Sequence, residues 1–330
     1  MTDFAEYVGK QVMITGGLGM LGSTLAHKLV ALGANITLVD VRLPQHGSNN
    51  FNIQGIEDRV RLCEADVRDK AVIDTLVAGK DIIFNFAAQA SHNDSYRDPI
   101  LDLDINYRGH VNILEACKAH NQTAKVLYSG SRLQFGRIQY FPVDENHPLN
   151  PLTPYAVNKN AAEAYSQYMH RFQGMRTVAF RIANPYGPRA QVKHHKFTII
   201  NWFLRQAMED KPIRVFGDGS QVRDYIFIDD LVDAFTQAGI NPNSDGEVYN
   251  IGSGAGTKFI KMAETIIDVV GTGRIEQVPW PADYKDAETG DYVTNIKKAR
   301  THLDWMPKVQ LRAGLEKTFK FYEQHKAHYF

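Results

Sequence analysis

Short apolar runs rich in β-branched residues alternate with longer amphipathic segments through the first part of the chain. The apolar runs predict strands at residues 11–15, 35–40, 60–64, 81–85, 125–129 and 177–181. The amphipathic segments predict helices at residues 20–32, 69–78, 101–120 and 153–172. Short strands that alternate with helices are typical of βαβ units with right-handed crossovers. We therefore expect an α/β fold in which a doubly wound parallel sheet is covered by helices on both faces.

The alternation ends near residue 184, where Asn-Pro-Tyr-Gly-Pro at 184–188 predicts a turn. Beyond it we expect a helix at 197–209, strands at 213–216 and 224–228, a turn at 217–220, and a helix at 229–238 that returns to the main sheet. These elements indicate a smaller, mixed α/β lobe. We predict a first domain over residues 1–183, with returning segments at about 224–250, and a second lobe over residues 184–330.

The composition excludes several classes of protein. Lys and Arg total 37, as do Asp and Glu, so the chain lacks the basic excess expected of a nucleic-acid partner. Cys63 and Cys117 form no CxxC pair, so we expect neither a disulfide framework nor a metal site. The first residues carry acidic side chains and no apolar segment, and no run of about 18 apolar residues occurs. We therefore expect a cytoplasmic globular protein without a membrane span.

A glycine-rich motif follows the first predicted strand and opens the first predicted helix. Its glycines occupy the positions of G-x-G-x-x-G, a spacing that permits a tight turn and close approach of the backbone to a pyrophosphate. The N-terminus of the following helix offers unpaired N–H groups to the phosphates. The motif indicates a Rossmann-type sheet. Its predicted cofactor contacts are Gly16, Gly19, Met20, Leu21 and Gly22.

Residues at the ends of the next predicted strands extend this site. Asp40 ends the second strand, at the interval where a carboxylate binds an adenosine ribose. It favours NAD over NADP because a carboxylate repels a 2′-phosphate, although Arg42 lies two residues later. Ligands of open α/β sheets bind at these carboxyl ends of the strands. The third and fourth strands add Asp66, Val67, Phe86, Ala87 and Ala88 as predicted contacts. The sequence therefore predicts NAD as the cofactor.

Three residues carry the expected chemistry. Tyr155 and Lys159 lie four positions apart in a predicted helix, which places them on one helix face. A lysine ammonium near a phenol favours the phenolate, so we expect a lowered pKa for Tyr155. Such a tyrosine takes a proton from a substrate hydroxyl while hydride leaves for a nicotinamide. Ser131 follows the fifth strand and is expected to hold the same hydroxyl by a hydrogen bond.

Together these motifs resemble the extended short-chain dehydrogenases/reductases, in the branch of NAD-dependent sugar-nucleotide epimerases and dehydratases. The resemblance covers nearly the whole chain, and the motifs occur in the family's order. It implies that Tyr155 is the base, that Lys159 binds the nicotinamide ribose and tunes Tyr155, and that Ser131 orients the substrate. It also places Asn106 in the cofactor site. The alternative is that Asn106 only shapes its own helix. The same resemblance implies a homodimer formed through helices at 101–117 and 161–169.

The resemblance also implies a nucleotide-sugar site in the second lobe. Asn184 would contact the substrate near its phosphates, and Arg223 would pair with the diphosphate. Glu288 departs from the family because many relatives carry an arginine there for the phosphates. We expect another cation, such as Lys285 or Arg189, to supply that charge, or a different substrate. The remaining predicted substrate contacts are Gln89, Ser131, Arg132 and Asp291.

The residues after Ser131 narrow the reaction. Dehydratases of this branch carry an Asp-Glu pair there, and related decarboxylases carry a Glu two residues after the serine, whereas this chain has Arg132 and Leu133. We therefore expect an epimerase that forms a transient keto-sugar, with C4 as the common site in the family. The segment 295–309 resembles CDP-tyvelose 2-epimerases and leaves C2 open. Arg132 suits a uronic acid carboxylate, which leaves an NDP-uronate epimerase or decarboxylase open.

Other interpretations stay open. A keto-sugar reductase would prefer NADP, which Asp40 disfavours, and a non-catalytic dinucleotide-binding regulator would typically have lost Tyr155 or Lys159. His92 and Asp94 are expected either at the substrate hydroxyls or in loop structure. The basic run at 193–196 is expected to be a solvated loop rather than a phosphate clamp.

Overall fold

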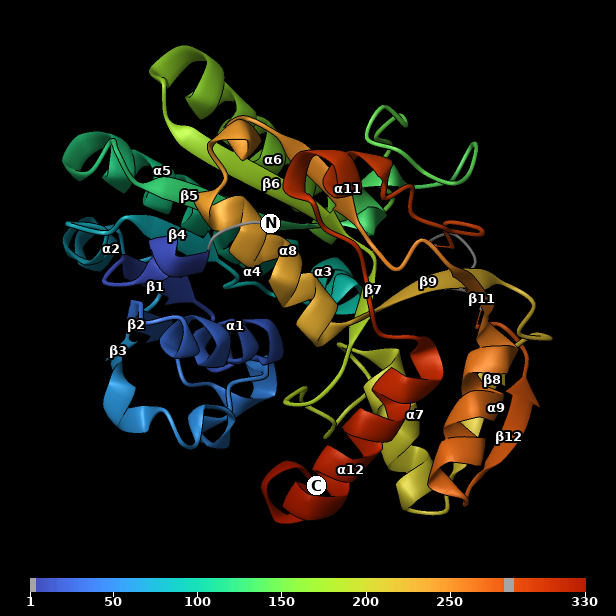
Figure 1. The fold of residues 1–330 in the computed structure, drawn as a ribbon. Coiled ribbons are helices and arrows are strands. Elements are labelled where there is room, and N and C mark those ends of the chain that lie inside the picture. The colour runs from blue at the N-terminus through green and yellow to red at the C-terminus, as the bar shows by residue number, and fades with distance from the viewer. Residues whose placement is uncertain (1–3, 282–287) are drawn as a thin grey trace.

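A seven-stranded parallel sheet forms the centre of the protein in a computed structural model, which describes residues 4–281 and 288–330 (Figure 1). The strand order is β10-β6-β5-β4-β1-β2-β3, and each pair is parallel. The strands are β1 (Gln11–Thr15), β2 (Asn35–Asp40), β3 (Val60–Glu64), β4 (Ile82–Asn85), β5 (Lys125–Ser131), β6 (Arg176–Ile182) and β10 (Val248–Ile251). The order reverses between β1 and β4, which opens a crevice at the carboxyl ends of the strands.

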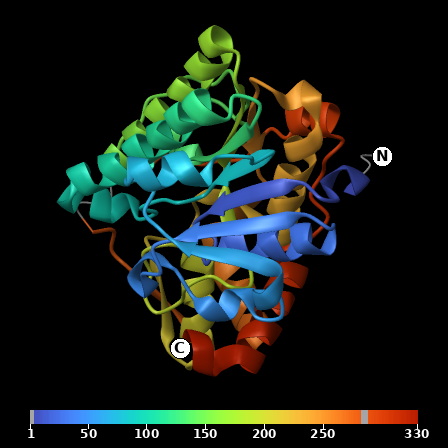
Figure 2. The same cartoon turned by 90° about the vertical axis from the view of Figure 1, so that its left-hand side faces the viewer.

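The six strands predicted in the first part of the chain are confirmed, with small shifts at their ends. Their β-branched residues are buried on both faces because helices cover the sheet on both sides (Figure 2). Successive residues of β1 alternate between the two faces. Val12 and Ile14 join the apolar cluster beneath α1 (Met20–Ala31), whereas Met13 joins the cluster beneath α5 (Gly109–His120). The predicted fold class is therefore confirmed.

The predicted helix at 101–120 is confirmed, but it begins two residues earlier and contains a π turn. The structure has α3 (His92–Arg97), then α4 (Pro99–Leu103), then a π-helical turn at Asp104–Arg108, and only then α5. The Asp98 side chain accepts from the Leu101 N–H at 2.9 Å and so starts α4 early, with Pro99 in its first turn. A π turn inserts one extra residue into a helix and shifts the helical face by less than one turn. The spacing of apolar residues in the sequence therefore does not reveal it.

The remaining helices of the first part agree with the prediction to within a few residues. They are α2 (Lys70–Leu76) and α6 (Pro154–Gln173). Short 3-10 helices lie at Phe4–Tyr7, Pro44–His46, Asn50–Ile53, Glu57–Arg59, Arg132–Phe135 and Pro242–Ser244. Across residues 4–281 and 288–330, the structure holds no helix that is long and apolar enough to cross a membrane.

The second lobe contains two small sheets. One joins β7 (Asn184–Tyr186), β9 (Val222–Phe227) and β11 (Gly256–Lys258), and the other pairs β8 (Pro212–Phe216) with β12 (Arg274–Val278). Its helices are α7 (Ile199–Met208), α9 (Phe259–Val270) and α12 (Leu311–Tyr329). The turn predicted at 184–188 is wrong for its first three residues, which form β7 because β9 pairs with them. The turn at 217–220 is confirmed.

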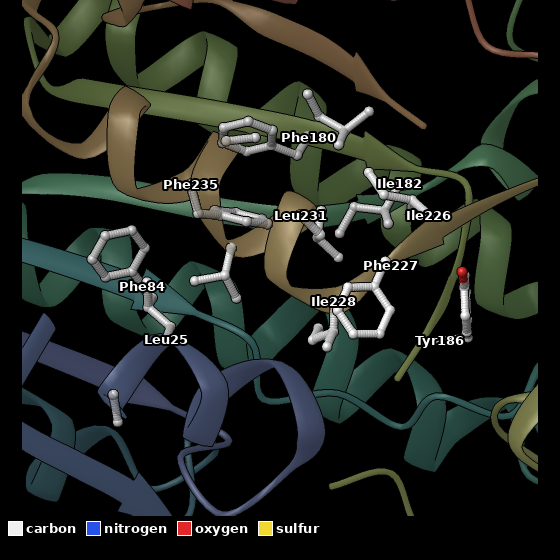
Figure 3. Packing of buried hydrophobic residues seen from close by; sticks show 14 of the residues in the cluster. Leu25, Phe84, Phe180, Ile182, Tyr186, Ile226, Phe227, Ile228, Leu231 and Phe235 are labelled. Carbon is white, nitrogen blue, oxygen red and sulfur yellow. The ribbon is translucent and has the colours of Figure 1, made fainter. Parts of the chain in front are cut away.

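The chain returns from the second lobe to the main sheet. Helix α8 (Ile228–Ile240) follows β9 directly and lies across the sheet beside α1, and β10 then pairs with β6 (Figure 1). Phe235 of α8 packs against Phe180, with ring centroids 4.1 Å apart, and lies near Phe84 (Figure 3). Helix α11 (Lys297–Leu303) packs beside α8 and β10. The domain boundaries stay a prediction.

A buried histidine connects the sheet to two helices. His110 of α5 lies 2.9 Å from Asn85 Nδ2 through Nδ1, and 2.7 Å from Ser166 Oγ through Nε2. Asn85 in turn accepts a hydrogen bond from Thr15 Oγ1. Burial lowers the pKa of His110 to about 3, and the nearby Lys159 ammonium acts in the same direction. The imidazole is therefore neutral in the folded protein at neutral pH.

We expect His110 to make the fold sensitive to acid. Between pH 6.5 and about 3 the unfolded chain binds a proton at this residue and the folded chain does not, so stability falls as pH falls through this window. The slope is up to about 1.4 kcal/mol per pH unit. His110→Gln should flatten the decline in the free energy of unfolding, measured by urea titration across this window. His120→Gln, on the exposed side of the same helix, is the matched control and should keep the wild-type slope. Equal slopes for His110→Gln and wild type would contradict the prediction.

Candidate active site

A cavity of about 1120 Å³ lies at the carboxyl ends of the central strands. Residues of the glycine loop after β1, of β2, β5 and α6 form one side of its wall, and residues of α7, β8 and β9 form the other side. This volume is large for a small-molecule site and is enough for two sizeable ligands side by side. The cavity therefore joins the predicted dinucleotide site to the second lobe.

The glycine loop shapes the first part of this wall. Gly16 has a φ of +65°, and a Cβ added there would lie 3.0 Å from the backbone of Ala87. A Cβ added at Gly22 would lie 2.2 Å from the Gly16 carbonyl oxygen. Helix α1 begins at Met20. Its N-cap residue, Gly19, has no side chain to accept hydrogen bonds from the first N–H groups, so these groups face the cavity. The loop therefore provides the close backbone approach and the helix N-terminus that a pyrophosphate requires.

Asp40 lies at the next strand end and lines the same wall. Its carboxylate accepts from the N–H of Leu18 at 3.0 Å and of Arg42 at 2.9 Å, and from the Ser48 hydroxyl. The Arg42 guanidinium instead pairs with Glu64, at 3.4 Å, and does not line the cavity. The only charge that this strand end presents to the cavity is therefore negative, which fits a ribose diol better than a 2′-phosphate.

Most of the predicted cofactor contacts line the cavity together. This wall fits a dinucleotide because its backbone approach, helix N-terminus and carboxylate occur in the required order along the sheet edge. The predicted residues found there are Gly16, Gly19, Met20, Leu21, Gly22, Asp40, Asp66, Val67, Phe86, Ala87, Ala88, Tyr155 and Lys159.

The three predicted catalytic residues come together on one wall. Ser131 ends β5, and Tyr155 and Lys159 lie in the first turns of α6, which begins at Pro154 after a Thr153 cap. The Ser131 hydroxyl is hydrogen-bonded to the phenol of Tyr155. The Lys159 ammonium donates to the Ser129 carbonyl at 2.9 Å and lies 5.8 Å from the ring centroid of Tyr155. The arrangement can exchange a proton with a ligand hydroxyl placed against Ser131 and Tyr155.

The expected direction of the Tyr155 pKa is wrong. Burial raises the pKa of Tyr155 to about 12, and the hydrogen bond from Ser131 only partly offsets this effect. Burial also lowers the pKa of Lys159 to about 8, although the Asp102 carboxylate favours its charged form. The lysine ammonium favours the phenolate, but the removal of both groups from water is the larger effect here.

A buried carboxylate that the sequence reading missed lies behind Lys159. Asp102 of α4 accepts from Asn158 at 2.7 Å and from Gln89 at 3.0 Å, and Asn106 also hydrogen-bonds to it. Gln89 and Asn106, predicted as substrate and cofactor contacts, do not line the cavity, because their side chains hold this cluster instead. The sequence gives little signal for Asp102, since most aspartates of short helices are exposed.

The second-lobe part of the wall contains a tight ion pair. Arg223 binds Glu288 through two contacts of 2.6 and 2.8 Å, and also donates to the backbone of Val222 and Gly290. Glu288, the position that departs from the family, therefore neutralises the arginine that was predicted for the diphosphate. Asn184 lines the cavity and donates to the Asp224 carbonyl at 2.8 Å.

Two other predicted substrate contacts lie away from the cavity wall. Asp291 accepts from the Val222 N–H at 2.7 Å, and the Arg189 guanidinium lies over the Phe321 ring at 5.8 Å. Lys285, the other cation proposed for the phosphates, is outside the described residues.

His92 does line the cavity, and burial lowers its pKa to about 4. Asp94 pairs with Lys196 at 2.9 Å, so the basic run at 193–196 contributes one cation to the wall.

An aromatic group that the sequence reading did not find forms the far part of the wall. Phe216 and Trp280 lie with ring centroids 5.6 Å apart. These rings suit a planar ligand. The other second-lobe residues of the wall include Trp202, Phe203, Gln206, Gln221 and Phe259. Within residues 4–281 and 288–330, no cluster of His, Cys, Asp or Glu is suited to hold a metal ion.

Comparison with known proteins shows similarity across both lobes. The sequence model of the NAD dependent epimerase/dehydratase family matches residues 12–252. The chain is 31% identical over 316 residues to a UDP-glucose 4-epimerase from Mycolicibacterium smegmatis, with 94% of this chain and 98% of the relative covered. It is 26% identical over 333 residues to a CDP-paratose 2-epimerase from Salmonella typhi, with the same coverage of 94% and 98%. The solved structure of an epimerase from Methanothermobacter thermautotrophicus matches with a TM-score of 0.91 at 29% identity, covering 98% of this chain and 95% of that one.

We expect Gly22→Ala to weaken NAD⁺ binding by roughly tenfold or more, because the added methyl forces the glycine loop apart. The dissociation constant, measured by isothermal titration calorimetry, should rise, and the melting temperature should also fall because the methyl meets backbone atoms. Gly19→Ala is the matched comparison, since its methyl meets no neighbour closer than 3.3 Å and should weaken binding less. Similar dissociation constants for wild type and Gly22→Ala would contradict this account of the loop.

Proposed function

The chain belongs to the NAD dependent epimerase/dehydratase family, and we propose that it inverts the C4 hydroxyl of a nucleoside-diphosphate sugar through a transient keto-sugar. The observation that carries this proposal is the convergence of Ser131, Tyr155 and Lys159 on one wall of a cavity that spans both lobes. The similarity to a UDP-glucose 4-epimerase across nearly the whole chain supports the choice of reaction and of C4.

NAD, when bound, supplies the acceptor of a hydride and later its donor. The glycine loop and the N-terminus of α1 hold its pyrophosphate, and Asp40 holds the adenosine ribose. Lys159 holds the nicotinamide ribose.

The protein's own residues handle the proton. Tyr155 takes the proton of the sugar hydroxyl and returns it after the ketone has turned over in the cavity. Ser131 holds the hydroxyl, and then the ketone oxygen, by a hydrogen bond. The Lys159 ammonium stabilises the phenolate, a contribution that matters more because burial alone disfavours that form. Burial of this group also keeps water away from the keto-sugar.

The carboxylates of the wall favour an epimerase over a dehydratase or a decarboxylase. Within the part of the chain that the structure describes, the carboxylates lining the cavity are Asp40, Asp66 and Glu288. The first two lie at strand ends of the dinucleotide site, and Glu288 is paired with Arg223. Ser131 is followed by Arg132 and Leu133, so no neighbouring acid is placed for elimination at C5 and C6.

The second lobe holds the nucleotide part of the substrate in this proposal. Phe216 and Trp280 offer aromatic faces for the base, and Asn184 lines the same cavity. The identity of the base is left to measurement. We also propose a cytoplasmic location, which agrees with the free thiols of Cys63 and Cys117.

We propose that the protein forms a homodimer through α6 and the neighbouring short helices. Several of the exposed large apolar side chains gather on α3, α4 and α6, namely Tyr96, Ile100, Leu103, Val157, Tyr168 and Phe172. Ile100 and Phe172 are 66% and 73% exposed. A cluster of this kind on adjacent elements is typical of an interaction surface, whereas single exposed apolar residues are common.

Replacement of Tyr155 by Phe tests the proposed reaction. Wild-type protein incubated with a panel of UDP-, GDP-, CDP- and dTDP-sugars should equilibrate one sugar with its epimer, observed by proton NMR. Tyr155→Phe should lower kcat by about 100-fold to 10,000-fold because the proton acceptor is lost. Tyr140→Phe, which changes an exposed phenol outside both the cavity and the proposed dimer surface, should keep the wild-type rate. If no sugar of the panel changes, or if Tyr155→Phe keeps full activity, the proposal fails.

The dimer is tested by light scattering after gel filtration. The wild-type mass should be twice 37.2 kDa, and the double variant Ile100→Glu/Phe172→Glu should shift toward the monomer mass because it buries two carboxylates in the interface. Val8→Glu is the matched control, since Val8 is 69% exposed and lies outside the proposed surface. A monomeric wild-type protein would refute the dimer.

A further inference from the structure

Arg132 differs from the other cations of the cavity wall. Five of the described Lys and Arg side chains in the wall each form an ion pair with a carboxylate. These pairs are Arg68–Asp66 at 2.6 Å, Lys196–Asp94 at 2.9 Å, Lys211–Glu209 at 2.7 Å, Arg214–Glu276 at 3.6 Å and Arg223–Glu288 at 2.6 Å. The Asp102 carboxylate lies near the Lys159 ammonium and favours its charged form. Arg132 has no carboxylate at ion-pair distance among the described residues; the Glu288 carboxylate favours its charged form from farther away but is itself bound to Arg223.

Neutral groups hold the Arg132 side chain in place. Its Nε donates to Asn184 Oδ1 at 3.2 Å, and Nη1 donates to Thr289 Oγ1 at 3.0 Å. The guanidinium also lies over the Tyr292 ring at 5.4 Å. A guanidinium carries five N–H donors, so these contacts fix its plane and leave donors unused. Within residues 4–281 and 288–330, the side chain is therefore oriented without an ion pair of its own.

An oriented and unneutralised cation in a closed wall is costly unless a ligand supplies the opposite charge. Burial lowers the pKa of Arg132 to about 10, and the Arg223 guanidinium acts in the same direction. The group still carries its charge at neutral pH. His92, whose pKa is lowered by burial and then by Arg132, stays neutral and does not provide a counter-charge. The missing negative charge is therefore expected on the substrate.

The position of Arg132 indicates which part of the substrate carries that charge. Arg132 directly follows Ser131 and lines the same cavity as Ser131 and Tyr155. In a hexopyranose, C6 is attached to C5, next to C4, whereas C1, which bears the diphosphate, lies across the ring from C4. A group beside the catalytic pair is therefore nearer to C6 than to the phosphates when C4 reacts.

We propose that Arg132 binds a carboxylate at C6 of the sugar, so that the substrate is a nucleotide-activated uronic acid. The planar fork of arginine matches a carboxylate through two parallel hydrogen bonds. This inference rests on the proposed epimerase function, because it takes C4 as the reacting carbon. The competing source of negative charge is the diphosphate, which would lie beside Ser131 if C2 reacted instead.

A matched pair of substrates tests the inference. UDP-glucose and UDP-glucuronate differ at C6 only, and kcat/KM for the epimerisation of each is measured by proton NMR with saturating NAD⁺. The wild-type protein should prefer the uronate. Arg132→Gln should lower the ratio of the two kcat/KM values by about 100-fold, because the carboxylate loses its buried partner. Arg132→Lys should restore part of that ratio, since it keeps the charge and loses the fork.

Arg214→Gln is the control, because Arg214 is another guanidinium of the wall, is paired with Glu276 and is not among the groups that act on Arg132. It should leave the ratio of the two kcat/KM values unchanged. Melting temperature and NAD⁺ affinity are measured for each variant, so that a loss of folding is recognised. A wild-type preference for UDP-glucose, or an Arg132→Gln variant with an unchanged ratio, overturns the inference. An equal loss for both substrates also overturns it and assigns Arg132 to the diphosphate.

Binding measurements separate this inference from the proposed reaction. If UDP-glucuronate binds more tightly than UDP-glucose in an Arg132-dependent manner, and neither is epimerised, the carboxylate site stands and the epimerase proposal fails. If UDP-glucose is epimerised and UDP-glucuronate neither binds nor reacts, the epimerase proposal stands and the carboxylate site fails.

Discussion

The burial of one ammonium group connects the fold of this protein to its chemistry. Lys159 lies where α6 crosses the end of β5, and its side chain is held by the Ser129 carbonyl and by the field of Asp102. The position of the Asp102 carboxylate depends in turn on Asn158 and Gln89, which donate hydrogen bonds to it from two other segments of the chain. Sheet, π turn and helix must therefore all be in place before the ammonium sits beside Tyr155. A buried charge of this kind is tolerated only where surrounding groups are arranged to stabilise it.

The same burial explains why spacing alone gave the wrong pKa for Tyr155. Four-residue spacing correctly predicted that Tyr155 and Lys159 share a helix face, because helix geometry is local. The pKa depends on how much water the whole fold removes from the phenol, which is not a local property. Burial raises the pKa of Tyr155 and lowers that of Lys159, so each group is displaced toward its neutral form. The proposed reaction therefore depends on the ligands that complete the cavity to restore the charged pair.

The sequence predicted those parts of the fold that short-range patterns determine. Strands β1 to β6 were recognised because buried parallel strands are continuous apolar runs, and the glycine loop because its spacing is a backbone requirement. Strand β7 was missed because its Asn-Pro-Tyr sequence becomes a strand only through pairing with β9. The Asp102 cluster and the Arg223–Glu288 pair were missed for the same reason: each joins segments that are distant in sequence. Local patterns thus predicted the cofactor wall better than the substrate wall.

The substrate wall is best understood through its charges rather than through single residues. A diphosphate needs positive charge, yet Glu288 occupies the fork of Arg223 and leaves Arg132 as the guanidinium without a carboxylate in the described wall. Glu288 therefore does more than withhold a phosphate contact. It neutralises Arg223, so that among the described residues the guanidinium of the wall without an ion pair is Arg132, beside Ser131. A site arranged in this way distinguishes substrates by the charge on the sugar ring, because every ligand of the class shares the diphosphate.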